Sequence, residues 1–223
     1  MASILQNKLT LRLSILILLI VLTACTREPQ KTTCDDSTRV LSMPILGSSL
    51  SQATVDYVYI ASNYADLTEP PPGSNHSGIH LSPISASASA EIEYFAASDA
   101  TITKIESQLS AGTHNVNVQL LAESGITLVY QFETQASQNE ALVAQQSKIR
   151  VTEGQTVQRG DSIGILHDHD GPGGATHPIF HLGVINCDGQ LVCPAGHFQA
   201  ADLDTLTTLL NRDHPEWQLC YGD

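Results

Sequence analysis

Short apolar runs separated by glycine, proline and aspartate fill the chain beyond residue 50, a pattern of β-strands rather than of long helices. The alternation is clearest in Asn115–Leu121, where Val116, Val118 and Leu120 face one way and the polar residues between them face the other. Further strands are expected at Val55–Ile60, Glu91–Ala97, Thr101–Leu109, Ile126–Glu133, Lys148–Val151, Ser162–Leu166 and Ile179–Ile185.

Two segments carry helical signals. Gln138–Ala144 is expected to form one short helical turn, and Ala200–Leu210 places four leucines at helical spacing. Val151–Gly164 repeats valine, isoleucine and glycine in a pattern that predicts two short strands joined by tight glycine turns, which is typical of barrel-sandwich-hybrid domains. These patterns predict an all-β fold, a barrel-sandwich hybrid with a short C-terminal helix.

The N-terminus has the pattern of an export signal. Its one long apolar run, Leu13–Leu22, follows Lys8 and Arg12 and is too short for a comfortable membrane span. The run ends in Leu22-Thr23-Ala24-Cys25, which resembles a bacterial lipobox in which Cys25 is lipidated and becomes the first mature residue. An ordinary secretory signal with an incidental cysteine is the alternative. We expect a signal peptide over 1–24, a lipidated cysteine and tether over 25–50, and one β domain over 51–223.

The amino-acid composition and net charge exclude some classes of binding partner. The 223 residues are 42% hydrophobic and only 15% charged, so the chain can bury a core. The formal net charge is −13, and the predicted signal segment holds two of the ten basic residues and none of the acidic ones. This balance argues against a protein that binds nucleic acid through its phosphates. Contact with a membrane is expected through the lipid anchor alone.

Four cysteines remain beyond Cys25, namely Cys34, Cys187, Cys193 and Cys220. In an exported protein this number suggests two disulfides, with three possible connectivities. Cys187 and Cys193 enclose a segment with the composition of a hairpin turn, so we expect them to pair with each other and Cys34 to pair with Cys220. A cysteine metal site is the alternative, although the spacing contains no Cys-x-x-Cys.

Histidines gather in segments that a β fold could bring to one metal. His76 and His80 are four residues apart and would point to the same side in either a helix or a strand. His181 lies within the expected strand Ile179–Ile185, which would hold it rigidly. A surface or core role is the alternative for each histidine taken alone, and the run His167–Asp170 is expected to be a solvated turn.

The order of these pieces resembles that of the lysostaphin-like (LytM-type) zinc metallopeptidases, which are built on the duplicated hybrid motif. His76–His80 matches the family's His-x-Gly-x-Asp, and Val151–Gly164 matches its run of valines and glycines. Ile179–Val184 matches the closing His-x-His-Phe-x-Val. Looser matches are Ala97–Ile102 to Ala-x-x-Gly-x-Val and Tyr130–Glu133 to Tyr-x-His-Leu. The resemblance covers roughly residues 70 to 186.

The resemblance implies one zinc ion held by His76, His80 and His181, with His80 standing where the family has aspartate. Three histidines are a known zinc arrangement that leaves a fourth position for water.

The family's two assisting histidines fall on Phe132 and Ile179 in this alignment, and neither side chain can transfer a proton. His177 is the expected substitute base, with His167, His169 and His114 as further candidates.

These residues imply a zinc endopeptidase that cuts peptidoglycan peptide cross-links. The two replaced histidines leave an alternative open, a catalytically degenerate member of the fold that binds or regulates other cell-wall enzymes. Peptidoglycan or other cell-wall proteins are the expected partners. Because Thr26 rather than aspartate follows Cys25, the lipobox resemblance implies anchoring at the outer membrane, facing the periplasm.

Overall fold

The computed structural model describes residues 34–37, 39–42, 57–61, 78–82, 92–110, 113–134, 139–167 and 179–213. All of them belong to the unit that spans Thr33–Asp223.

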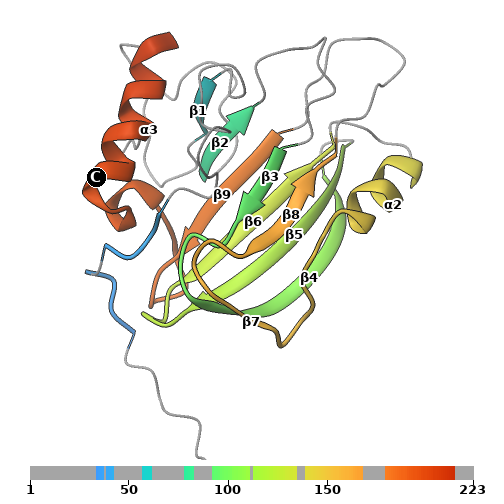
Figure 1. The fold of residues 1–223 in the computed structure, drawn as a ribbon, viewed down its shortest axis with the longest axis horizontal. Helices are drawn as coiled ribbons and strands as arrows, with labels where there is room; N and C mark the ends of the chain where they lie inside the picture. Colours follow the sequence, from blue (N-terminus) through green and yellow to red (C-terminus); the bar gives the residue numbers. More distant parts are fainter. Residues whose placement is uncertain are drawn as a thin grey trace, which may run out of the picture. The chain divides into compact units, whose positions relative to one another are not determined.

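Within these ranges, the chain forms an open antiparallel sheet of eight strands and a separate ribbon of two strands (Figure 1). The large sheet has the order β1, β2, β9, β6, β5, β4, β7, and β10 pairs with β9. Its strands are β1 (Tyr57–Ala61), β2 (Gly78–Ser82), β4 (Ala100–Ser110), β5 (Thr113–Ala122), β6 (Thr127–Glu133), β7 (Thr156–Val157), β9 (Ile179–Ile185) and β10 (Leu191–Val192). The ribbon consists of β3 (Ile92–Phe95) and β8 (Ser162–Leu166).

Two α-helices lie in the described ranges, α2 (Asn139–Ser147) and α3 (Ala200–Asp213), and a short 3-10 helix over Pro194–His197 precedes α3. The leucine spacing of α3 buries Leu206, Leu209 and Leu210, as the sequence predicts. Neither α-helix has the length and apolarity that a membrane span requires. The expectation of an all-β domain with a C-terminal helix is confirmed.

The core lies between the β3–β8 ribbon and the large sheet. Tyr94 of β3 stacks on Phe180 of β9 with 3.8 Å between the ring centroids, and Tyr130 and Phe132 of β6 meet Phe180 edge-on. All four rings are fully buried. Because successive strand residues point to opposite faces, the even-numbered residues of β6 and β9 face the ribbon and the odd-numbered ones face away from it.

The segment Val151–Gly164 adopts the predicted pair of short strands with glycine turns. Gly154 and Gly160 have φ of +81° and +92°, which favours glycine at these turns before and after β7. The strand expected at Lys148–Val151 is absent. Instead, Ile149 makes a single bridge to Gly164.

Residues 34–37 and 39–42 pack onto the domain, although they were expected to belong to the tether. Leu41 is fully buried and pairs with Phe198 in a parallel bridge. The amide N–H of Ser42 donates to the carbonyl of Ala97 at 2.8 Å. We call residues 34–37 and 39–42 the N-terminal arm. The arm packs on the core although it precedes residue 51, where the domain was expected to begin.

The disulfide pairing expected from the sequence is wrong. Cys34 is bonded to Cys187, across 153 residues of sequence, and Cys193 is in a disulfide of its own. The predicted hairpin is present, but its register pairs Leu191 with Ile185, so Cys187 lies in the turn and is not opposite Cys193. Pairing across the hairpin would need the two cysteines to face each other.

Among the described residues, the Cys34–Cys187 disulfide also excludes the alternative of a metal site at these two cysteines. The ligand atoms of Cys34, Asp36 and Cys187 lie within 4.8 Å of one another, the spacing of a metal site. The two sulfur atoms are bonded to each other, however, and a disulfide offers no thiolate to a metal.

Candidate functional site

The sheet brings His80 and His181 together from segments that are 101 residues apart in sequence. Strands β2 and β9 are antiparallel neighbours, and their register pairs His80 directly with His181. Residues paired in this way have Cα atoms about 4.5–5.5 Å apart. Two of the three predicted zinc ligands therefore occupy one cross-strand position.

Glu133 holds the imidazole of His181. Glu133 ends β6, the strand on the other side of β9, and its Oε2 lies 2.8 Å from His181 Nε2. The Thr113 hydroxyl donates to the second carboxylate oxygen, Oε1, at 2.9 Å. Both members of the pair are buried, His181 at 3% exposure and Glu133 at 6%. Because a carboxylate accepts hydrogen bonds, this contact places a ring proton of His181 on Nε2.

The same face of the sheet carries two buried asparagines beside this pair. Asn115 of β5 pairs with Glu133, and Asn117 pairs with Gln131, which in turn pairs with His181. Asn115 is 1% exposed and Asn117 is 7% exposed, and neither Oδ1 atom accepts a hydrogen bond. A buried oxygen without a donor costs about 1–3 kcal/mol. Both asparagines therefore carry an unsatisfied buried oxygen on the face of the sheet that holds His181.

The resemblance places the first assisting histidine at Phe132. Phe132 is fully buried in the aromatic core, on the face of β6 away from His181. Its neighbour Glu133 is the residue that reaches His181. The two side chains differ in this way because successive residues of a strand point to opposite faces.

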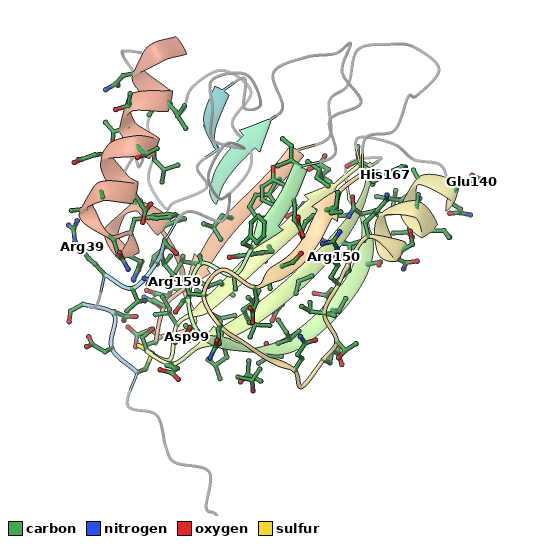
Figure 2. All side chains as sticks on the ribbon, in the orientation of Figure 1. Arg39, Asp99, Glu140, Arg150, Arg159 and His167 are labelled. Carbon is green, nitrogen blue, oxygen red and sulfur yellow. A yellow bond between two sulfur atoms is a disulfide. The ribbon has the colours of Figure 1, made fainter. Side chains whose placement is uncertain are left out.

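Two of the further base candidates lie away from His181. His114 alternates with the core residues of β5, and it therefore faces the ribbon side of the sheet. His167 follows β8 in the ribbon and donates its backbone N–H to Gln145 of α2 at 2.8 Å; Figure 2 labels His167 together with Glu140 of α2.

Several predicted site residues lie outside the described residues. These are the metal candidate His76, the base candidates His177 and His169, the lipidation site Cys25 and the cysteine Cys220. Ile179 is described by its backbone, which pairs with Glu133.

Sequence reasoning missed Glu133, Asn115 and Asn117. The signal was present in the alternation of β5 and β6, which puts Asn115, Asn117, Gln131 and Glu133 on one face. The sequence did not show that β9 would lie next to β6, and so it did not place these residues beside His181.

No family model and no curated protein matches the chain. Among solved structures, lysostaphin, "the antimicrobial peptidase lysostaphin from Staphylococcus simulans", is 18% identical over 74% of this chain, with a TM-score of 0.43. A second lysostaphin structure is 16% identical over 67% of the chain, with a TM-score of 0.41. The catalytic domain of a prophage-encoded M23 protein from Enterococcus faecalis is 16% identical over 67% of this chain and 92% of its own length, with a TM-score of 0.40.

The chain spans about half the length of the two lysostaphin structures, 55% and 49%.

Proposed function

We propose that this chain is a zinc-dependent peptidase of the bacterial cell envelope that hydrolyses peptide bonds of peptidoglycan. The observation that carries the proposal is the His80–His181 strand pair, with His181 fixed by the buried carboxylate of Glu133. A histidine that binds a metal through one ring nitrogen usually donates its other N–H to a carboxylate or carbonyl. The Glu133–His181 contact supplies this arrangement.

The residues present fit zinc. Neutral imidazole nitrogens are preferred zinc ligands, and His80, His181 and His76 supply three of them. Bound zinc lowers the pKa of a coordinated water and polarises a carbonyl oxygen.

Each neighbouring residue has a distinct role in this proposal. Glu133 is a positioning residue, since both of its oxygens are engaged, by Thr113 and by His181. His177 remains the proposed base.

Metal stoichiometry is the first experiment. The full-length chain, purified in detergent and supplied with zinc, should hold about one zinc per chain by mass spectrometry. The His76→Ala/His181→Ala variant should lose it. Glu133→Gln should weaken zinc affinity by about 10–100-fold, because the neutral amide is a poorer acceptor for His181 Nε2–H. His167→Gln is the matched control and should bind zinc as the wild type does.

Absence of zinc in the wild-type chain, even after zinc is added back, would contradict the proposal. If zinc binds, release of soluble fragments from purified peptidoglycan tests hydrolysis. His181→Ala should abolish release, and His177→Ala should lower it if His177 is the base.

A second candidate function is a domain that binds peptidoglycan or another cell-wall enzyme without cutting it. The engagement of both Glu133 oxygens favours this reading, because the carboxylate nearest His181 is not free to take a proton from water. Zinc binding without release of fragments by the wild type would select this candidate.

We further propose that Cys25 carries a lipid that anchors the chain at the outer membrane, facing the periplasm. The support is the Leu22-Thr23-Ala24-Cys25 motif after an apolar run, followed by Thr26. Labelling of growing bacteria with a fatty-acid analogue should mark the wild-type chain and leave a Cys25→Ser variant unmarked. Fractionation of the two membranes then tests the location.

A further inference from the structure

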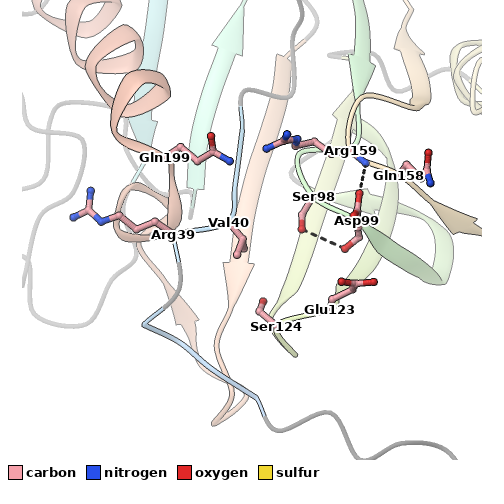
Figure 3. A pocket seen from close by; sticks show the side chains of 9 residues that line it. All are labelled: Arg39, Val40, Ser98, Asp99, Glu123, Ser124, Gln158, Arg159 and Gln199. Carbon is pink, nitrogen blue, oxygen red and sulfur yellow. Dashed lines mark hydrogen bonds between the residues drawn. The ribbon is translucent and has the colours of Figure 1, made fainter.

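A polar pocket of about 550 Å³ lies at the end of the domain remote from His181. Five segments converge on it: the N-terminal arm, the loop before β4, the turn after β5, the loop before β8 and the residue before α3. Its lining residues are Arg39, Val40, Ser98, Asp99, Glu123, Ser124, Gln158, Arg159 and Gln199 (Figure 3). Glu123 follows the end of β5 whereas Asn115 lies near its start, so pocket and candidate zinc site are separated by most of that strand, roughly 30 Å at 3.4 Å per residue.

The arginine that spans the pocket has no acidic partner. In the part of the chain that the structure describes, Arg150 pairs with Glu93, but the guanidinium of Arg159 makes no ion pair or hydrogen bond. Figure 3 shows the side chains of Arg159 and Gln199 extending toward each other. Arg159 is exposed, and its guanidinium and the amide of Gln199 are hydrogen-bond donors that a carboxylate can reach from solvent.

The acidic residues of the pocket lie on another part of its wall. Asp99 Oδ1 accepts the backbone N–H of Arg159 at 2.7 Å, and the carboxylate of Glu123 lies beyond Asp99 in Figure 3. Neither carboxylate makes an ion pair with Arg159 or Arg39. The pocket therefore contains positive and negative side chains that form no ion pairs with each other.

The hydroxyl of Ser124 adds a second sign of an incomplete site. Its Oγ is buried in the pocket wall and has no hydrogen-bond partner. Buried hydroxyls are normally satisfied, so Ser124 contributes an unsatisfied polar group to the pocket wall.

From these observations we infer that the pocket binds a small dipolar ligand, a short peptide with free amino and carboxyl ends. The carboxylate meets Arg159 and Gln199, and the ammonium group meets Glu123 and the unoccupied oxygen of Asp99. The volume lies within the range of small-molecule sites, about 300–1,000 Å³. This binding does not depend on the proposed hydrolysis.

Calorimetric titration of the full-length chain with the dipeptide alanyl-alanine tests the inference. Its C-terminal amide should bind at least tenfold more weakly than the free dipeptide, and its N-acetyl form should also bind at least tenfold more weakly, because each lacks one charge-assisted contact. Arg159→Gln should weaken binding of the free dipeptide by a similar factor. In the Arg159→Gln variant, amidation of the dipeptide should weaken binding little further. This non-additivity would show that the ligand carboxylate contacts Arg159.

Two further variants serve as controls for this experiment. Arg150→Gln removes an arginine that pairs with Glu93 outside the pocket and should leave binding unchanged. Arg159→Lys retains the charge and should reduce binding less than Arg159→Gln. No saturable binding by the wild type would overturn the inference, as would equal binding of the free and amidated dipeptides. Equal binding of the free and N-acetyl dipeptides would overturn the dipolar assignment.

Discussion

At the scale of single residues, two buried tyrosines of the core make opposite use of their hydroxyls. The Tyr130 hydroxyl accepts the N–H of Ala97 at 2.8 Å and donates to the carbonyl of Phe95 at 3.0 Å. The Tyr94 hydroxyl is equally buried and has no partner. Burial raises the pKa of both phenols, so both are neutral at physiological pH.

This contrast predicts opposite effects of the same substitution. Tyr130→Phe leaves the Ala97 N–H and the Phe95 carbonyl without their partner and should lower the free energy of unfolding by about 1–3 kcal/mol. Tyr94→Phe removes a buried, unbonded hydroxyl while keeping the ring stacked on Phe180, and should leave stability unchanged or raise it by about 1 kcal/mol. Urea unfolding of both variants measures the difference. A loss of stability in Tyr94→Phe as large as in Tyr130→Phe would show that the account of the two hydroxyls is wrong.

The face on which a side chain lies was predicted correctly where hydrophobic and polar residues alternate clearly. It was not predicted for Glu133, where a sequence motif was the only guide. The alternation of Asn115–Leu121 correctly predicted Val116, Val118 and Leu120 as one buried face. The motif comparison singled out Phe132 and gave no sign that the next residue, Glu133, would reach His181. Neighbouring residues of a strand point to opposite faces, so one of the two is a core ring and the other a carboxylate beside His181.

At the scale of elements, strands were easier to predict than their ends and partners. The bounds of β8 and β9 were predicted correctly as Ser162–Leu166 and Ile179–Ile185. The helix α2 extends to nine residues where one turn was expected, since tertiary contacts rather than amphipathicity hold it. Which strands become neighbours depends on long-range pairing, and a single sequence does not reveal it.

The contacts of α2 with the ribbon depend on one buried glutamine. Gln145 has no exposed surface, its Nε2 donates to the carbonyl of Ile165, and its Oε1 accepts the N–H of His167, both at 2.8 Å. Gln145→Ala should cost about 2–4 kcal/mol, because it leaves two backbone groups unpaired. Hydrogen exchange should show faster exchange of the His167 amide.

The neighbouring Gln146 supplies the control. Its Nε2 donates to the Ser107 hydroxyl at 2.9 Å in an exposed position, so Gln146→Ala should change stability by less than about 1 kcal/mol. Equal effects of the two substitutions would contradict the assignment of α2 docking to Gln145.

At the scale of the whole molecule, the sequence did not show that the N-terminal arm packs on the core. The arm is mostly polar and was expected to be part of a tether, yet Leu41 is fully buried and Cys34 is bonded to Cys187. The polar composition of a segment does not reveal that one of its residues is buried and that another forms a disulfide. Cysteine pairing likewise depends on which segments meet in space, and sequence proximity favoured the wrong partner for Cys187.

A buried histidine at the arm makes stability depend on pH. Burial lowers the pKa of His197 below its ordinary value of 6.5, and the negative charge of Asp36 offsets part of this change. Below about pH 6.5 the unfolded chain binds a proton that the folded chain does not, so this contribution to stability is lost as pH falls. The destabilisation caused by His197→Gln should therefore shrink between pH 7 and pH 5 in urea unfolding. A difference between variant and wild type that does not change with pH would contradict the assignment to His197.

The Cys34–Cys187 disulfide should contribute more to stability than any single side chain discussed above. It closes a loop with a sequence separation of 153 residues, and loops of this size restrict the unfolded chain by about 5 kcal/mol in the chain-entropy account. A Cys34→Ser/Cys187→Ser variant retains the disulfide of Cys193 and should lose about 3–5 kcal/mol.

Amide exchange separates loss of the disulfide from loss of the arm. Leu41 and Ser42 donate their N–H groups to the carbonyls of His197 and Ala97, so these amides report whether the arm stays docked. Because Leu41 belongs to the hydrophobic core, we expect the two amides to remain protected in the serine variant while global stability falls. A Leu41→Ala variant with the disulfide intact should show the reverse, faster exchange at Ser42 with the loop still closed. If removal of the disulfide alone releases both amides, the disulfide rather than Leu41 fixes the arm, and with it the Arg39 and Val40 wall of the polar pocket.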